Sequence, residues 1–183
     1  LHIYSHQFNS IELNSTHYST PDPVLLASWK EATPVDFKFC PKFPQEISHL
    51  RLLRQSNDLA REFCSQLWQL GRSRLGLFFL QLPPQFSPND LRVLDSFLEH
   101  LPRSIPLAIE FRNPLYFKNQ EIYSPVLDLL ERFNVATVIT DTAGRREVLH
   151  QNLSAPQVMI RFLANSLHKS DYTPAETVRK VTS

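Results

Sequence analysis

The chain has 183 residues, of which 42% are hydrophobic and 20% charged, and its formal net charge is +1. This length and composition predict one globular domain, residues 1–183, with a sizeable core. The small net charge argues against a nucleic-acid-binding surface, and no apolar run is long enough to cross a membrane. The three glycines are too few for the familiar glycine-rich phosphate loops.

Two cysteines, Cys40 and Cys64, lack the spacing of a metal site. We expect reduced structural thiols in a cytoplasmic protein, with no structural zinc and no disulfide. The chain begins LHIYSHQF, with neither a methionine nor a signal-like segment. We therefore expect further residues to precede Leu1.

Six short runs rich in apolar residues are predicted to be strands, and helical patterns separate them. In chain order the runs are Ser10–Thr16, Asp36–Phe43, Leu75–Leu82, Leu107–Arg112, Ala136–Asp141 and Gln157–Leu163. Strands that alternate with helices predict a parallel arrangement with right-handed crossovers. Such strands form either an open doubly wound sheet or most of a (β/α)8 barrel, which typically needs about 250 residues.

Helix starts share one signal, a capping oxygen followed by proline at the first helical position. The signal occurs at Asp22-Pro23, Ser87-Pro88, Ser124-Pro125 and Thr173-Pro174. Apolar residues at helical spacing support two helices, one with Leu59, Phe63, Leu67 and Leu70, and one with Leu91, Leu94, Leu98 and Leu101. Gly71 is expected to end the first of these helices.

Polar side chains recur at or near the carboxyl end of every predicted strand. They are Glu12 and Asn14, Lys42, Gln81, Glu110 and Arg112, Asp141, and Arg161. Alternate residues of a strand point to opposite faces, and on the clearest strands these residues oppose the apolar face. A barrel gathers such side chains at one mouth, so the pattern favours a barrel over an open sheet.

The motifs IELNSTHY, FCPKFP, FFLQLPPQF, AIEFRNPLYF, ITDTAGRREVLH and MIRFLANSLHKSDY resemble, in this order, those of the YecE-like family. That family is a TIM-barrel-like domain of unknown function, and the match runs along nearly the whole chain. The resemblance implies a partial α/β barrel here, because the family's first and last strands are missing. It also points to Glu12, Asn14, Tyr18, Lys42, Gln81, Glu110, Arg112, Asp141 and Arg161 as the family's polar cluster. His17 departs from the family, which usually has Phe at this position.

These residues predict a binding site for a small polar or anionic metabolite. The candidate catalytic residues are Glu12, Lys42, Glu110 and Asp141, and the candidate ligand-binding residues are Asn14, Tyr18, Gln81, Arg112 and Arg161. Arginines clamp anions with forked hydrogen bonds, and a buried carboxylate with a raised pKa serves as acid or base. Lys42 among apolar walls is a candidate for Schiff-base chemistry, whereas beside Glu12 or Glu110 it stays charged.

Three alternatives remain open at this point. A balanced set of carboxylates and cations also fits a structural salt-bridge network in a non-catalytic binding or partner module. A metal-dependent sugar isomerase-like or nuclease-like barrel would use Glu12, Glu110, Asp141 and His17, but three cations at the same mouth oppose a bound metal. No metal or cofactor is therefore predicted.

Unpaired strand edges predict that another copy of the chain or flanking segments cover them.

Overall fold

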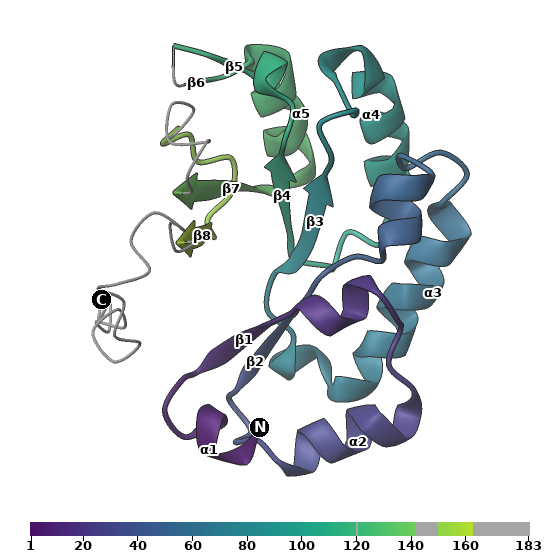
Figure 1. The fold of residues 1–183 in the computed structure, drawn as a ribbon, viewed down its shortest axis with the longest axis vertical. Coiled ribbons are helices and arrows are strands. Elements are labelled where there is room, and N and C mark those ends of the chain that lie inside the picture. The colour runs from purple at the N-terminus through teal and green to yellow at the C-terminus, as the bar shows by residue number, and fades with distance from the viewer. Residues whose placement is uncertain (120, 142–149, 163–183) are drawn as a thin grey trace, which may run out of the picture.

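The computed structural model describes residues 1–119, 121–141 and 150–162, with Asp141 described by its backbone alone. It is a mixed α/β fold with parallel strands and with helices along one side of them (Figure 1). The six long strands are β1 (Ser10–Leu13), β2 (Lys38–Pro41), β3 (Phe78–Leu82), β4 (Leu107–Phe111), β7 (Ala136–Asp141) and β8 (Met159–Phe162). All six predicted strands are therefore found, several of them shorter than predicted.

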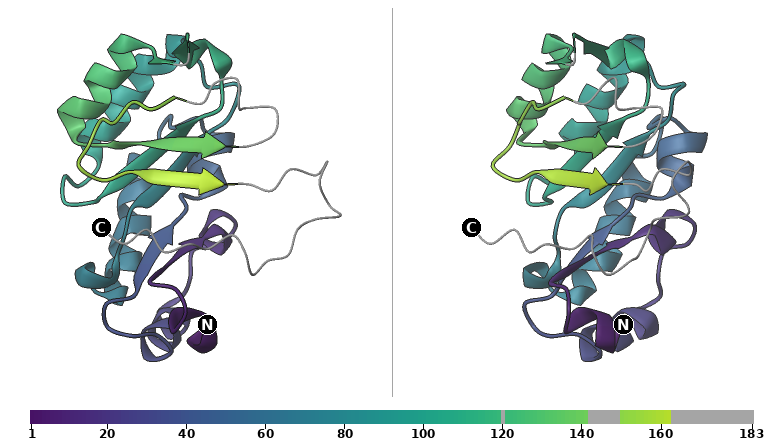
Figure 2. Two further views of the ribbon diagram at one scale, coloured as in Figure 1. Left: turned by 90° about the vertical axis from the view of Figure 1, so that its left-hand side faces the viewer. Right: turned by 60° about the vertical axis from the view of Figure 1, so that its left-hand side comes forward.

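The strands are neighbours in the order of the chain. β1 pairs in parallel with β2, and β3, β4, β7 and β8 form a parallel four-stranded sheet. Two isolated parallel bridges, Phe39 with Leu75 and Lys42 with Phe79, connect β2 to β3. Figure 2 shows β7 and β8 side by side, pointing in the same direction. Parallel strands in sequential order need crossover connections, and α2, α3, α4 and α5 supply those from β1 through β7.

The helices begin largely where the sequence signals predict. They are α1 (His2–Ser5), α2 (Pro23–Glu31), α3 (Asn57–Leu67), α4 (Leu91–His100) and α5 (Ser124–Phe133). Asp22 caps α2 by accepting a 2.8 Å hydrogen bond from the amide of Leu25. Ser87 forms a capping box with Asp90. In α5 the cap position is Tyr123, so the prediction of a Ser124 cap is wrong by one residue. The Thr173-Pro174 signal lies outside the described residues.

Short elements make up most of the connections. The single turns are η1 (Asn14–His17), η2 (Glu46–Leu50), η3 (Trp68–Leu70), η4 (Arg72–Arg74), η5 (Pro88–Asp90) and η6 (Pro114–Tyr116). A small antiparallel hairpin of β5 (Phe117–Lys118) and β6 (Glu121–Ile122) precedes α5. Gly71 ends η3 with a φ of 92°, a left-handed value that favours glycine.

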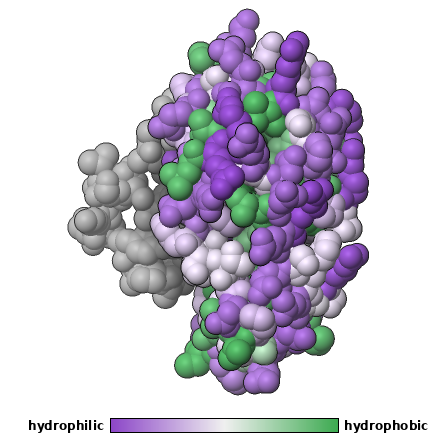
Figure 3. All heavy atoms as spheres, turned by 90° about the vertical axis from the view of Figure 1, so that its right-hand side faces the viewer, coloured by the Kyte–Doolittle hydropathy of each residue, from purple (hydrophilic) through white to green (hydrophobic). Residues whose placement is uncertain are grey.

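The core lies mainly between the strands and the helix layer. Outward-facing strand residues such as Phe39, Leu80 and Ile109 are fully buried there. A smaller apolar cluster of Phe79, Ala108, Ala136 and Val138 lies on the opposite strand face. The helix side that meets solvent is mostly hydrophilic, with scattered apolar side chains (Figure 3). This division gives each central strand two buried faces, as in parallel sheets generally.

The inner face of the strands carries the connection between the two ends of the sheet. Arg161 on β8 hydrogen-bonds to Glu12 on β1, which brings the first and last strands within reach of one side-chain pair. No backbone pairing joins β8 to β1 within the described ranges, so the parallel sheet curls without closing there. None of the helices in this part of the chain is long and apolar enough to cross a membrane.

Candidate functional site

Inward-facing polar residues from five strand regions meet at the carboxyl end of the sheet. Glu12 comes from β1, Lys42 directly follows β2, Gln81 lies on β3, Glu110 on β4 and Arg161 on β8. The register places Gln81 beside Glu110 and Lys42 beside Phe79, so these side chains share nearly one level. Strand alternation therefore brings them together although up to 149 residues separate them along the chain.

Glu110 is the centre of this polar cluster, and only 2% of its surface is exposed. One carboxylate oxygen accepts a 3.0 Å hydrogen bond from Gln81 Nε2 and forms an ion pair with the guanidinium of Arg112. The other oxygen accepts a 2.8 Å hydrogen bond from Arg161. Three donors, two of them cationic, compensate for the loss of hydration of this buried carboxylate.

Arg161 ties three strands together. Its guanidinium donates two hydrogen bonds to Glu12, at 2.9 and 3.0 Å, and one to Glu110. Its planar group also lies over the ring of Phe79, 4.6 Å from the centroid. Burial by itself lowers the pKa of Arg161, but hydrogen bonding and attraction from Glu12, with attraction from Glu110, raise the pKa overall. Arg161 is thus a fully compensated cation.

Lys42 is also buried, with 9% of its surface exposed, but its charge is compensated in a different way. Its ammonium donates a 3.1 Å hydrogen bond to the neutral amide oxygen of Gln81 and lies 5.5 Å from the centroid of Phe79. Within the described residues no carboxylate lies at ion-pair distance from it. Burial lowers the pKa of Lys42, and Arg161 lowers it further, against partial compensation by Glu12 and Glu110.

The structure places two of the predicted residues outside the cluster and leaves a third untested. β1 ends at Leu13, and the chain turns into η1, so Asn14 leaves the face of Glu12 and is exposed. Tyr18 follows this turn and is 74% exposed. The parity prediction for Asn14 fails because it assumed a strand that continued to Thr16. Asp141 ends β7, and its side chain lies outside the described residues.

Two histidines lie near Lys42, namely His17, which the sequence indicated only as a possible metal ligand, and His49, which was not assigned to the site. His17 is buried, and its Nδ1 is 2.8 Å from the carbonyl oxygen of Phe43. Its ring lies 5.0 Å from that of His49 in an edge-on arrangement. Burial lowers the pKa of both histidines, and the charge of Lys42 lowers them further. The spacing of 32 residues gives no local sequence signal, because η1 and η2 meet only in the folded chain.

No group of three or more histidine, cysteine, aspartate or glutamate side chains suited to a metal occurs among the described residues. Cys40 and Cys64 are free thiols. Burial raises the pKa of Cys40 to about 11 and that of Cys64 to about 12. Both are therefore protonated near neutral pH, and neither thiol acts as a nucleophile there.

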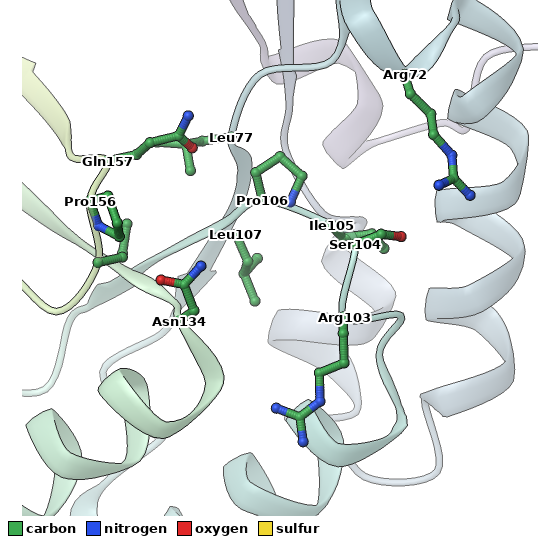
Figure 4. A pocket seen from close by; sticks show the side chains of 12 residues that line it. Arg72, Leu77, Arg103, Ser104, Ile105, Pro106, Leu107, Asn134, Pro156 and Gln157 are labelled. Carbon is green, nitrogen blue, oxygen red and sulfur yellow. The ribbon is translucent and has the colours of Figure 1, made fainter.

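A hollow of about 460 Å³ lies at the opposite, amino-terminal end of the strands. Leu77, Leu107 and Asn134 line it (Figure 4). Arg72 and Arg103, also at its wall, stack on the rings of Trp68 and Phe133 at 4.7 and 4.2 Å from the centroids. The buried charged side chains lie instead at the carboxyl end of the strands, in the polar cluster.

Comparison with known proteins identifies the family of this chain. It is 38% identical over 142 residues to the UPF0759 protein YecE of Escherichia coli K12 and to that of Escherichia coli O157:H7. The aligned region covers 78% of this chain and 52% of either relative, so the chain spans about half the length of the curated relatives it matches.

Solved structures of similar shape come from two other bacteria. A DUF72 family protein of Enterococcus faecalis V583 is 20% identical, with a TM-score of 0.76 over 92% of this chain and 70% of that protein. A DUF72 family protein of Thermotoga maritima MSB8 is 22% identical, with a TM-score of 0.71 over 87% and 61%. These similarities establish the shared fold. The model of the family described as "Protein of unknown function DUF72" matches residues 1–182, and the chain belongs to this family.

Proposed function

We propose that this chain binds a small anionic metabolite at the carboxyl mouth of a TIM-barrel-like (β/α) barrel, with Lys42 as the anchoring cation. The curled sequential parallel sheet and the Arg161 link between its two ends support the barrel. Such a protein would act on a diffusible cytoplasmic compound. Strand edges would be covered by a second copy of the chain or by flanking segments.

The observation that carries this proposal is the environment of Lys42. A buried ammonium is expensive unless a negative charge compensates for it, and here its hydrogen-bond acceptor is the neutral Gln81. An anion that reaches Lys42 would supply the missing charge and would raise the lowered pKa of the ammonium. Arg112 lies at the rim and is a quarter exposed, so the same anion would meet a second cation there.

Lys42 also suits proton transfer better than Glu12 and Glu110 do. A lysine with a lowered pKa exchanges its proton more readily near neutral pH than an ordinary lysine does. Glu110 is held by three donors, which fits a positioning role rather than proton transfer. Glu12 is a quarter exposed and faces Arg161, and we assign it the same kind of role.

A non-catalytic module is the second candidate, and one observation favours it. The contacts among Arg161, Glu12 and Glu110 are complete without a ligand, as expected for a structural network. The two candidates differ in their consequence for Lys42, because a purely structural cluster leaves Lys42 without a ligand.

Sulfate binding tests the proposal, since sulfate is a simple divalent anion without chemistry of its own. We expect sulfate, titrated at constant ionic strength, to bind the wild-type chain, and Lys42→Met to weaken binding at least about tenfold. Lys38→Met is the matched control, because Lys38 lies on the same face of β2 but is exposed. The control is expected to bind within about twofold of wild type. Equal sulfate affinities in wild type and Lys42→Met would refute Lys42 as the anchor.

A further inference from the structure

His17 is held beside the proposed anchor by contacts on two sides. The hydroxyl of Thr16 donates a 2.7 Å hydrogen bond to the carbonyl of Lys42, and His17 Nδ1 contacts the next carbonyl, that of Phe43. His49 packs edge-on against the ring. Only 7% of His17 is exposed, so the orientation of its imidazole is fixed by its surroundings.

The contact with Phe43 determines which ring nitrogen of His17 carries the proton. A carbonyl oxygen only accepts hydrogen bonds, so Nδ1 must be the donor at this 2.8 Å contact. Burial lowers the pKa of His17, and the charge of Lys42 lowers it further, although the hydrogen bond to Phe43 raises it, so the neutral imidazole is favoured overall. Nε2 therefore carries a lone pair, and it acts as a hydrogen-bond acceptor.

No group in the described part of the protein donates a hydrogen bond to this lone pair. Nε2 is also not one of the fully buried polar atoms without a partner, so part of its surface is exposed and the atom keeps some access to solvent. The hydrogen bonds of Thr16 and His17 to the Lys42 and Phe43 carbonyls place this ring near Lys42, whose charge lowers the pKa of the imidazole. An acceptor close to a cation site is suited to a ligand that brings both a negative charge and a donor.

The segment that positions His49 is conformationally strained. His49 lies in η2, a single π-helical turn, and Leu52, Leu53 and Gln55 just after it have φ values of 49°, 65° and 52°. Non-glycine residues in this left-handed region carry a cost and are concentrated at functional sites. Burial of Leu53 in the core holds this conformation in place, and with it the ring that packs on His17.

Building on the proposed anion site at Lys42, we propose that Nε2 of His17 accepts a hydrogen bond from the ligand. The mouth would then select an anion that also carries a hydroxyl donor, such as hydrogen phosphate or a hydroxy acid. His49 is a positioning residue, because it contacts the ring of His17 and orients it. A phenylalanine at position 17 would provide a ring without this acceptor.

Hydrogen phosphate and sulfate form a matched pair of probes. Both are tetrahedral, and at about pH 8 both carry two negative charges, but only hydrogen phosphate has a hydroxyl to donate. A lone pair on Nε2 attracts that hydroxyl and repels the corresponding oxygen of sulfate. We expect the wild-type chain to bind phosphate about three- to tenfold more tightly than sulfate, the range expected for one net hydrogen bond.

His17→Asn tests this selectivity without removing the structural contact. The asparagine amide takes the place of Nδ1–H and still donates to the carbonyl of Phe43, but nothing replaces Nε2. We expect phosphate affinity to fall to the level of sulfate. His150→Asn is the control, because His150 is another buried histidine and lies outside the cluster, and phosphate selectivity is expected to persist in it.

Nitrogen NMR of the wild-type imidazoles provides a readout that does not depend on the folding of a variant. We expect His17 to be protonated at Nδ1 and not at Nε2, and phosphate to shift the Nε2 resonance more than sulfate does. Protonation at Nε2 in the free protein, or equal binding of the two anions by wild type, would overturn the role of His17. Absence of binding by either anion would instead overturn the anion site itself.

Discussion

Arg161 and Lys42 are cations buried at the same mouth of the sheet, yet the protein compensates for them in opposite ways. Arg161 has two carboxylates, Glu12 and Glu110, and three hydrogen bonds. Lys42 has one neutral amide as its hydrogen-bond partner among the described residues. A charge network that is complete within the protein stabilises the fold, whereas an incompletely compensated cation retains affinity for an external anion. We therefore propose that structural and ligand-binding roles divide within one cluster.

The largest expected effect comes from removing the carboxylate at the centre of the cluster. Glu110→Ala leaves Arg112 and Arg161 with fewer negative charges in a buried site, so we expect a loss of about 3–5 kcal/mol in the free energy of unfolding. Urea denaturation measures this loss. Arg112→Ala, at the more exposed rim, is expected to cost less, and equal small losses in both variants would show that the network is not buried.

Removing Arg161 tests the compensated half of the comparison directly. Arg161→Met breaks the link from β8 to β1 and β4, but Glu110 keeps Gln81 and Arg112. We expect a loss of about 2–3 kcal/mol, the scale of hydrogen bonds between charged groups. Faster amide hydrogen exchange in β8 would accompany it, and unchanged exchange in β8 would contradict the linking role.

Removing Lys42 should have little effect on stability, in contrast to Arg161. Lys42→Met removes a buried ammonium that carries a desolvation cost, and it also removes the donor to Gln81. These two changes oppose each other, so we expect the free energy of unfolding to change by less than about 1 kcal/mol. A loss comparable to that of Arg161→Met would show that Lys42 is a structural cation.

The smallest expected effect concerns a buried base outside the cluster. Burial lowers the pKa of His150 from its ordinary 6.5, although its hydrogen bond to Val138 opposes this. The unfolded chain therefore takes up a proton below about pH 6.5 while the folded chain does not, and stability is lost as the pH falls from there toward the lowered pKa. His150→Asn should have a flatter stability profile in that range, and an unchanged profile would contradict the shift.

Local patterns in the sequence predicted the strands well, because apolar runs and capped helix starts report on short-range structure. Alternation along each strand also predicted the shared inward face of Glu12, Lys42, Glu110 and Arg161. The prediction failed at Asn14, where the strand ends and a turn begins. Alternation carries no information once the chain leaves the strand geometry.

The different compensation of Arg161 and Lys42 was not predictable from sequence. It depends on which donors reach Glu110, and this is decided by contacts between strands far apart in the chain. The sequence indicated His17 only as a possible metal ligand and did not assign His49 to the site, since their contact joins η1 to η2. Burial and pairing, unlike strand alternation, arise only when the whole sheet has curled.

The pKa of Lys42 in the folded protein, measured by NMR of its side chain with and without sulfate, tests the central claim most directly. The account predicts a value below the ordinary 10.5 in the free protein and an increase when sulfate binds. An ordinary pKa that does not respond to sulfate would contradict it, because Lys42 would then be neither incompletely compensated nor in contact with the anion.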